Sequence, residues 1–353
     1  MSDLQLGLAI LGLMVIVGVV VFNWWQERQF HNRARRDRLP PETDVLLPAE
    51  TAAAPGAPQQ PQTRIEPQLD TLAAAERLVI EADGPDPALD YIAELRAGEA
   101  IAAAAVSQLA SSLGQVGRRI VLAGYDHHAK TWEALGEGDR GYTSLRAGLQ
   151  LVDRSGPASI EQLQTFQSLI RQHAKQMSAI VDLPDIDSAI SHAGQLDAFC
   201  SDVDVVIGIN VIAHAGQVFH GTRVRALAEA SGLKLQANGV FVCPDEEGSP
   251  LFTLDNQEAK PFLIEQIRHI TTPGITFLLD VPRARDGLKV FDRMVALGRQ
   301  FADSLDGLLA DDNRQLLSDA GLDQIRTQLR GIYNQMEARG LPAGGPGAMR
   351  LFA

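Results

Sequence analysis

The feature that most constrains this chain is an uncharged, apolar run near its N-terminus, from Leu4 to Phe22. A helix of this length would rise about 28 Å at ~1.5 Å per residue, close to the ~30 Å hydrocarbon thickness of a bilayer. It would also satisfy its own backbone hydrogen bonds, as lipid requires. Trp24 and Trp25 follow the run, where amphipathic rings favour the headgroup zone. We therefore expect a single transmembrane helix over residues 4–25.

A cleaved signal peptide is the alternative interpretation of an N-terminal apolar run. It requires a basic region before the run and a small-x-small cleavage site after it. The charged side chain before this run is Asp3, and the run ends in Phe22-Asn23-Trp24-Trp25. Neither requirement is met, so the sequence favours an uncleaved anchor.

The segment that follows the run, residues 26–38, is rich in arginine. An excess of Lys and Arg marks the cytoplasmic side of a span, so we expect residues 1–3 to lie outside and the body of the chain to lie in the cytoplasm. The arginines are also expected to contact anionic lipid headgroups, at about 1 kcal/mol each. They are Arg28, Arg33, Arg35, Arg36 and Arg38.

The remainder of the chain is acidic, because the net charge of all 353 residues is −13 in spite of this arginine-rich segment. An acidic body repels phosphate-rich polymers, so we expect no nucleic-acid partner. Cys200 and Cys243 lack metal-ligand spacing, and we interpret Asp126-His127-His128 as a loop. Nucleophile-elbow, P-loop and dinucleotide-binding motifs are absent from the sequence. We therefore predict no metal, cofactor or catalytic residue, and no enzyme.

Proline density divides the chain into segments. Residues 39–84 are rich in Pro, Ala and Gln, which disfavours regular structure, so we expect a semi-extended linker. Residues 340–353, rich in Gly and Pro, are expected to form a flexible tail. Between them, residues 85–200 and 201–339 each combine strand-like and helix-like patterns, which predicts an α+β fold.

The two α+β regions share one order of expected elements. Each begins with a strand and continues with a short helix, further strands, a long helix and a final helix. The helices expected over residues 159–181 and 186–199 correspond to those expected over 288–309 and 318–336. Residue identity between the regions is faint. We interpret them as a diverged tandem pair, while two unrelated α+β domains or one large domain remain alternatives.

Residues 204–338 resemble the C-terminal domain of the ZipA family, bacterial division proteins that bind the tubulin-like FtsZ. The pieces that carry the resemblance are distinctive in their combination and order, and the layout of anchor, basic flank and linker is similar too. They are residues 205–214, 251–256, 271–277 and 306–312.

This resemblance implies an antiparallel sheet with helices on one face and, on the bare face, a shallow apolar groove for the C-terminal peptide of FtsZ. Because strand side chains alternate between faces, period-two spacing selects the residues that would line the groove. Asn238 and the polar segment 255–259 depart from the apolar residues usual in the family, which predicts weaker binding or a different peptide. The expected partner-binding residues are Val206, Gly208, Asn210, Val240, Thr276, Leu278 and Gln257.

We therefore predict a single-pass protein of the bacterial inner membrane, with residues 1–3 in the periplasm, that tethers FtsZ filaments to the membrane. An alternative is an envelope scaffold that uses the same domain for another protein partner or for self-association. A membrane-anchored hydrolase is disfavoured because the sequence shows no catalytic constellation.

Overall fold

The computed structural model of the chain describes residues 84–128, 130–135 and 141–353. The predicted transmembrane helix over residues 4–25, the basic segment 26–38 and the linker up to residue 83 lie outside the described residues. Among the described residues, no helix is both long enough and apolar enough to cross a bilayer.

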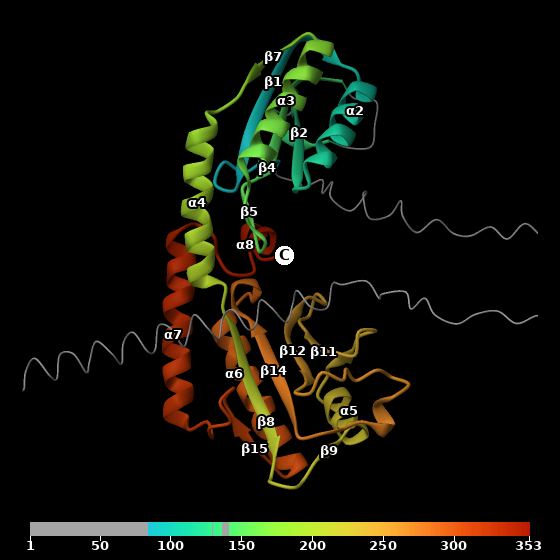
Figure 1. Ribbon diagram of the computed structural model, residues 1–353, viewed down its shortest axis with the longest axis vertical. Helices are drawn as coiled ribbons and strands as arrows, with labels where there is room; N and C mark the ends of the chain where they lie inside the picture. The colour runs from blue at the N-terminus through green and yellow to red at the C-terminus, as the bar shows by residue number, and fades with distance from the viewer. Residues whose placement is uncertain (1–83, 129, 136–140) are drawn as a thin grey trace, which may run out of the picture. The chain divides into compact units, whose positions relative to one another are not determined.

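The first lobe, residues 84–205, is built on a five-stranded antiparallel sheet with the strand order β3-β2-β4-β1-β7 (Figure 1). A small hairpin of two short strands, β5 and β6, precedes its long helix. Its elements are β1 (Asp90–Ile101), α2 (Ala103–Leu113), η3 (Gly114–Val116), β2 (Ile120–Asp126), β3 (Thr131–Ala134), β4 (Tyr142–Gln150), β5 (Val152–Asp153), β6 (Gly156–Pro157), α3 (Ile160–Gln176), β7 (Ala179–Asp182) and α4 (Ile186–Val203).

The core of the first lobe follows from alternation along its strands and from helix spacing. Tyr91 and Leu95 of β1 stand opposite Leu149 and Leu145 of β4, and all four are buried. The helices that cover this face begin at well-formed caps. Ser159 forms a capping box with Gln162 at the start of α3, and the Asp185 side chain accepts a hydrogen bond at the start of α4.

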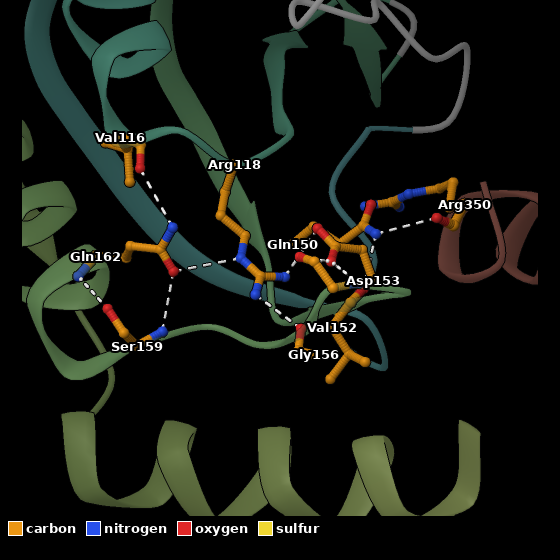
Figure 2. Close-up of polar contacts among 10 residues, drawn as sticks. Val116, Arg118, Gln150, Val152, Asp153, Gly156, Ser159, Gln162 and Arg350 are labelled. Carbon is orange, nitrogen blue, oxygen red and sulfur yellow. Dashed lines mark hydrogen bonds and ion pairs between the residues drawn. The ribbon is translucent and has the colours of Figure 1, made fainter. Parts of the chain in front are cut away.

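A buried arginine, Arg118, fastens the hairpin and α3 to the sheet (Figure 2). Its guanidinium donates to the Gly156 carbonyl at 2.7 Å and to Gln162 Oε1 at 3.3 Å, and it forms an ion pair with Asp153 at 3.1 Å. Because its charge is paired and its donors are used within the lobe, we assign Arg118 a structural role.

The second lobe, residues 206–339, is built on a six-stranded antiparallel sheet with the strand order β10-β11-β12-β14-β8-β15 (Figure 1). Two short strands, β9 and β13, pair with each other outside this sheet. The elements are β8 (Val206–Ala213), β9 (Phe219–His220), α5 (Gly221–Ala230), β10 (Lys234–Leu235), β11 (Phe241–Pro244), β12 (Pro250–Asn256), η4 (Ile267–His269), β13 (Thr271–Thr272), β14 (Gly274–Asp280), η5 (Val281–Arg283), α6 (Gly287–Leu305), β15 (Gly307–Ala310) and α7 (Asp319–Ala338).

One face of the second sheet carries the core of its lobe. Ile209 and Phe277 are directly paired in the β8–β14 ladder, and both are fully buried. Phe277 packs edge-on against Phe301 of α6, with 5.3 Å between the ring centroids. Helix α7 begins at Ser318, whose hydroxyl accepts a hydrogen bond from Gly321 N at 3.2 Å. Helices α5, α6 and α7 all contribute buried residues to this core.

The two lobes share the element order β-α-β-β-β-α-β-α. The strands β7 and β15, which lie between the long and the last helix of each lobe, are not part of the predicted order. The central strands also have equivalent neighbours, because β4-β1-β7 in the first sheet corresponds to β14-β8-β15 in the second. They differ in one hairpin. The first strand of the β2–β3 hairpin pairs with β4, whereas the second strand of the β11–β12 hairpin pairs with β14. The observed architecture is therefore α+β with antiparallel sheets.

The prediction of a flexible tail over residues 340–353 is wrong. This segment forms a last helix, α8 (Pro346–Leu351), and its buried side chains join the core of the first lobe. Arg350 forms a buried ion pair with Asp90, and Gln150 Nε2 donates to the Arg350 carbonyl at 3.1 Å (Figure 2). Glycine and proline disfavour a helix interior, which is the reason for the prediction. Pro346, however, occupies the first helical turn, where no hydrogen bond from its backbone nitrogen is required.

The boundary of α3 is a second correction. The sequence predicts one helix over residues 159–181, but α3 ends at Gln176 and residues 179–182 form the edge strand β7. Ser178, with φ of 52°, makes the break between them. The apolar spacing of Met177 and Ile180 fits a helix equally well, and only pairing with β1 decides for a strand.

Candidate functional site

The candidate site is the sheet face of the second lobe opposite α6, called the open face below. Register brings the predicted residues of β8 and β14 together there: Gly208 pairs with Leu278, and Asn210 pairs with Thr276. Val206, at the start of β8, lies on the same face by alternation. The register of β8 and β14 agrees with the face that period-two spacing assigns to these five residues.

Within the part of the chain that the structure describes, no helix buries the open face. The side chains of Thr276 and Leu278 are only half-buried, and Val206 is 53% exposed. Their strand neighbours Ile275, Phe277 and Leu279 are fully buried on the other face. Alternation in burial along β14 therefore separates a helix-covered face from an accessible one.

The centre of the open face is polar rather than an apolar groove. The Thr276 hydroxyl donates to Asn210 Oδ1 at 2.6 Å, and Asn210 Nδ2 donates to Asp312 Oδ1 at 2.9 Å. Asn210 is consequently only 2% exposed, and its amide is already engaged by hydrogen bonds within the lobe. The amide holds the loop that bears Asp312.

Gly208 leaves the space that Asp312 occupies. A Cβ added at Gly208 would lie 2.8 Å from Asp312 Oδ1, so any larger residue would push this carboxylate away. The loop itself is shaped by Asp311, whose Oδ1 accepts hydrogen bonds from the backbone N–H groups of Asn313 and Gln315 at 2.9 and 2.8 Å. The exposed Asp312 carboxylate is therefore positioned over β8 by groups on both sides.

Gln257 and Val240 lie at the margins of the face. Gln257 is half-buried just after β12, and its Oε1 atom lies against Gly274, where an added Cβ would be 2.5 Å away. Val240 is half-buried in the turn before β11, and its backbone N–H donates a hydrogen bond to Asn238 Oδ1 at 3.2 Å. Gln257 therefore borders the open face, whereas Val240 lies outside the strands that form it.

Two carboxylates give the open face its electrostatic character. Asp255 pairs with Thr276 in the β12–β14 ladder and is half-buried, and burial raises the pKa of its carboxyl group above the usual value. Asp312 lies on the other side of Thr276, through Asn210. Asp255 is one of the polar residues that depart from the family pattern, whereas Asp312 has no signal in the sequence, because strand alternation gives no position for a loop residue.

Two other polar clusters of the described residues have partners within the lobes. Between α6 and α7, Arg326 forms ion pairs with Asp292 and Asp323 in a depression lined by both helices. His127, from the Asp126-His127-His128 sequence, contacts Thr143 Oγ1 at 2.6 Å. No group of three His, Cys, Asp or Glu side chains suited to hold a metal ion is found in the described part of the chain.

Comparison with known proteins agrees with the geometry of the second lobe. Residues 205–328 match the family model described as ZipA, C-terminal FtsZ-binding domain. Cell division protein ZipA of Xanthomonas axonopodis pv. citri (strain 306) is 33% identical over 142 residues, which cover 39% of this chain and 58% of that protein. Its counterpart in Stutzerimonas stutzeri (strain A1501) is 32% identical over 132 residues, covering 36% of this chain and 48% of the relative.

The matched part of the chain thus spans about half the length of these relatives. It coincides with the second lobe, and the first lobe falls outside the family match. The resemblance seen in the sequence motifs is confirmed, because residues 205–328 match the model of the ZipA C-terminal domain and these relatives carry the name ZipA.

Proposed function

We propose that this protein is a cell-division adaptor that binds the C-terminal peptide of FtsZ on the open face and tethers FtsZ filaments to the bacterial inner membrane. The observation that carries the proposal is an accessible sheet face, from Val206 to Leu278, in a domain that matches an FtsZ-binding family. An adaptor role needs no catalytic group, and the open face offers binding surface rather than a catalytic constellation.

Binding on such a face draws on burial and on main-chain contacts with an extended peptide. Leu278 and Val206 remain accessible to water, and covering apolar area stabilises a complex by about 25 cal/mol per Å² before entropic costs. A single tail would be held weakly. A filament presents many tails to many anchored copies, so avidity replaces affinity.

The membrane part of the proposal rests on the sequence. The apolar run from Leu4 to Phe22 supplies the anchor and orientation, with residues 1–3 in the periplasm. The arginines of residues 26–38 add attraction to anionic lipid on the cytoplasmic side.

The direct test is fluorescence anisotropy with a labelled peptide from the C-terminus of the same bacterium's FtsZ and the full chain in neutral detergent micelles. Leu278→Asp places a charge in the middle of the face, so we expect a loss of affinity of at least about 30-fold, or ~2 kcal/mol. Ile180→Asp is the matched control, because Ile180 is 79% exposed and lies on the first lobe. Absence of binding by the unaltered chain, or equal loss in both variants, would contradict the proposal.

The polar centre of the open face favours one alternative, an envelope scaffold that uses this domain for a different protein partner or for self-association. Asn210 and Asp312 leave less apolar surface than the family groove implies. Sedimentation of the full chain in micelles tests self-association, which on this alternative is lost in Leu278→Asp while FtsZ peptide fails to bind.

A further inference from the structure

The open face carries two carboxylates on either side of one strand. Asp255 of β12 pairs with Thr276 of β14, which pairs in turn with Asn210 of β8, and Asp312 is bound to Asn210. Adjacent strands are about 4.8 Å apart, so Asp255 and the Asn210–Asp312 pair stand roughly 10 Å from each other, with Thr276 between them. A small cationic group above Thr276 would have a carboxylate on each side.

The structure leaves these two carboxylates without a cation from the described residues. Asp255 Oδ1 accepts from the backbone N–H of Asn256 at 2.7 Å, and Asp312 Oδ1 accepts from the Asn210 amide. Both donors are neutral. By contrast, Asp280, on the same face of β14, shares Arg154 with Asp204, at 2.9 and 2.8 Å.

This difference matters because a carboxylate removed from water without a cation carries a desolvation cost. Burial raises the pKa of Asp255, as expected for a half-buried carboxyl group that accepts a hydrogen bond from a neutral donor. Functional sites are where such local costs are retained, since a ligand offsets them on binding.

We propose that the peptide bound on the open face carries a lysine or arginine whose cationic group lies over Thr276, between Asp255 and Asp312, next to an apolar side chain on Leu278. This inference rests on the proposed function and names the chemistry of its ligand. Alternate side chains of an extended peptide repeat every ~6.6–6.8 Å, as Thr276 and Leu278 do along β14. A peptide with a basic and an apolar residue two positions apart therefore meets both features at once.

Long-range electrostatics favour the same ligand. The chain has a net charge of −13, so a basic segment is attracted to it and an acidic one is repelled. Close to the face, charge-assisted contacts with Asp255 and Asp312 would add to the burial of the apolar residue. The polar centre of the open face is then a recognition element, which selects a basic apolar tail over a purely apolar one.

The test uses the full chain in neutral detergent micelles and the labelled FtsZ C-terminal peptide, with versions in which each Lys or Arg is replaced by Gln. Asp255→Asn and Asp312→Asn remove one charge each and keep the shape of the side chain. Asp303→Asn is the matched control, because Asp303 is exposed on α6 and belongs to the helix side of the lobe.

We expect each face variant to weaken peptide binding by about five- to tenfold and to reduce its salt dependence, while the control stays within twofold. Replacing one particular basic residue of the peptide should produce the same loss, and the loss should not add to that of the face variants, as a double-mutant cycle would show.

The outcomes separate this inference from the proposed function. If Leu278→Asp abolishes binding but neither Asp255→Asn nor Asp312→Asn changes it, the adaptor proposal stands and the basic ligand is rejected. Unchanged affinity for all Gln-substituted peptides rejects it too. If the unaltered chain does not bind the peptide, both proposals fall.

Discussion

The two lobes have the same order of elements, yet their helix-free sheet faces are occupied differently. On the first lobe, Glu94 accepts contacts from both Arg96, at 2.7 Å, and Arg146, at 3.3 Å. Arg146 also stacks over Trp132, 4.1 Å from the ring centroid. The charges of that face are thus paired with one another, whereas Asp255 and Asp312 of the open face have no cationic partner among the described residues.

The chain itself also covers part of the first face. A Cβ added at Gly148 would lie 2.6 Å from Pro85, and one added at Gly84 would lie 3.0 Å from Ala123, so residues 84 and 85 pass directly over β4 and β2. Ala123 is fully buried as a result. A common fold therefore does not imply a common function, because the face residues and what crosses them differ.

The shared topology supports the interpretation of a diverged tandem pair, and the difference suggests how the copies separated. We propose that the second lobe kept an accessible face for a partner, while the first lobe became a structural unit closed by its own ion pairs and by residues 84–85.

The first lobe should depend on the C-terminal helix, and the open face should not. Arg350→Met leaves Asp90 buried without its charge partner, which we expect to cost about 3–5 kcal/mol of unfolding free energy. Urea unfolding followed by Trp132 fluorescence, in a chain with Trp24 and Trp25 replaced by Phe, measures this loss. Met349→Ala, one residue earlier on the same helix, should stay within about 1 kcal/mol.

The same variants test whether peptide binding by the second lobe depends on the first lobe. FtsZ-peptide affinity should be unchanged in Arg350→Met under conditions where the chain remains folded. A parallel loss of binding would show that the two lobes act as one functional unit, against the division proposed above.

A glycine in the first strand of each lobe should respond differently to substitution by alanine. Gly208→Ala places a Cβ against Asp312, so we expect a destabilisation of about 1 kcal/mol and a several-fold loss of peptide affinity. Gly98→Ala in β1 is the matched change, because nothing lies within 4 Å of its added Cβ, and it should be neutral or slightly stabilising. Thermal melts and anisotropy of both variants decide the matter, and equal effects would argue against Asp312 as a fixed part of the open face.

The smallest expected effect is a gain in stability. Burial raises the pKa of Asp255 in the folded state, so ionisation of this carboxyl group destabilises the fold. The contribution of the neutral carboxyl group to the unfolding free energy is therefore complete at low pH and is lost as pH rises through the folded-state pKa. Asp255→Asn should therefore raise the melting temperature slightly at pH 7, and this gain should vanish below the ordinary aspartate pKa of about 3.9. A stabilised variant with weakened peptide binding is the pattern expected of a functional carboxylate, and a melting temperature lowered at pH 7 would contradict the assigned cause.

The local features of this protein follow from the order of its residues alone. Alternation in 206–210 and 276–278 was enough to assign side chains to faces, because period two is a property of any strand. Helix starts at Ser159, Asp185 and Ser318 were equally local, since a cap needs only the backbone that follows it. The family motifs added the identity of the second lobe.

The groups that cover each sheet face come from residues that are distant in the chain. Asp312 covers Asn210 from 102 positions away, and α8 returns to Asp90 across 260 positions. Neither contact can be predicted from a periodic pattern in the sequence. The position of a loop carboxylate or of a Gly/Pro-rich segment is set by its tertiary contacts rather than by its neighbours in the chain. Burial and charge pairing both depend on these long-range contacts. They distinguish the covered sheet face of the first lobe from the accessible face of the second.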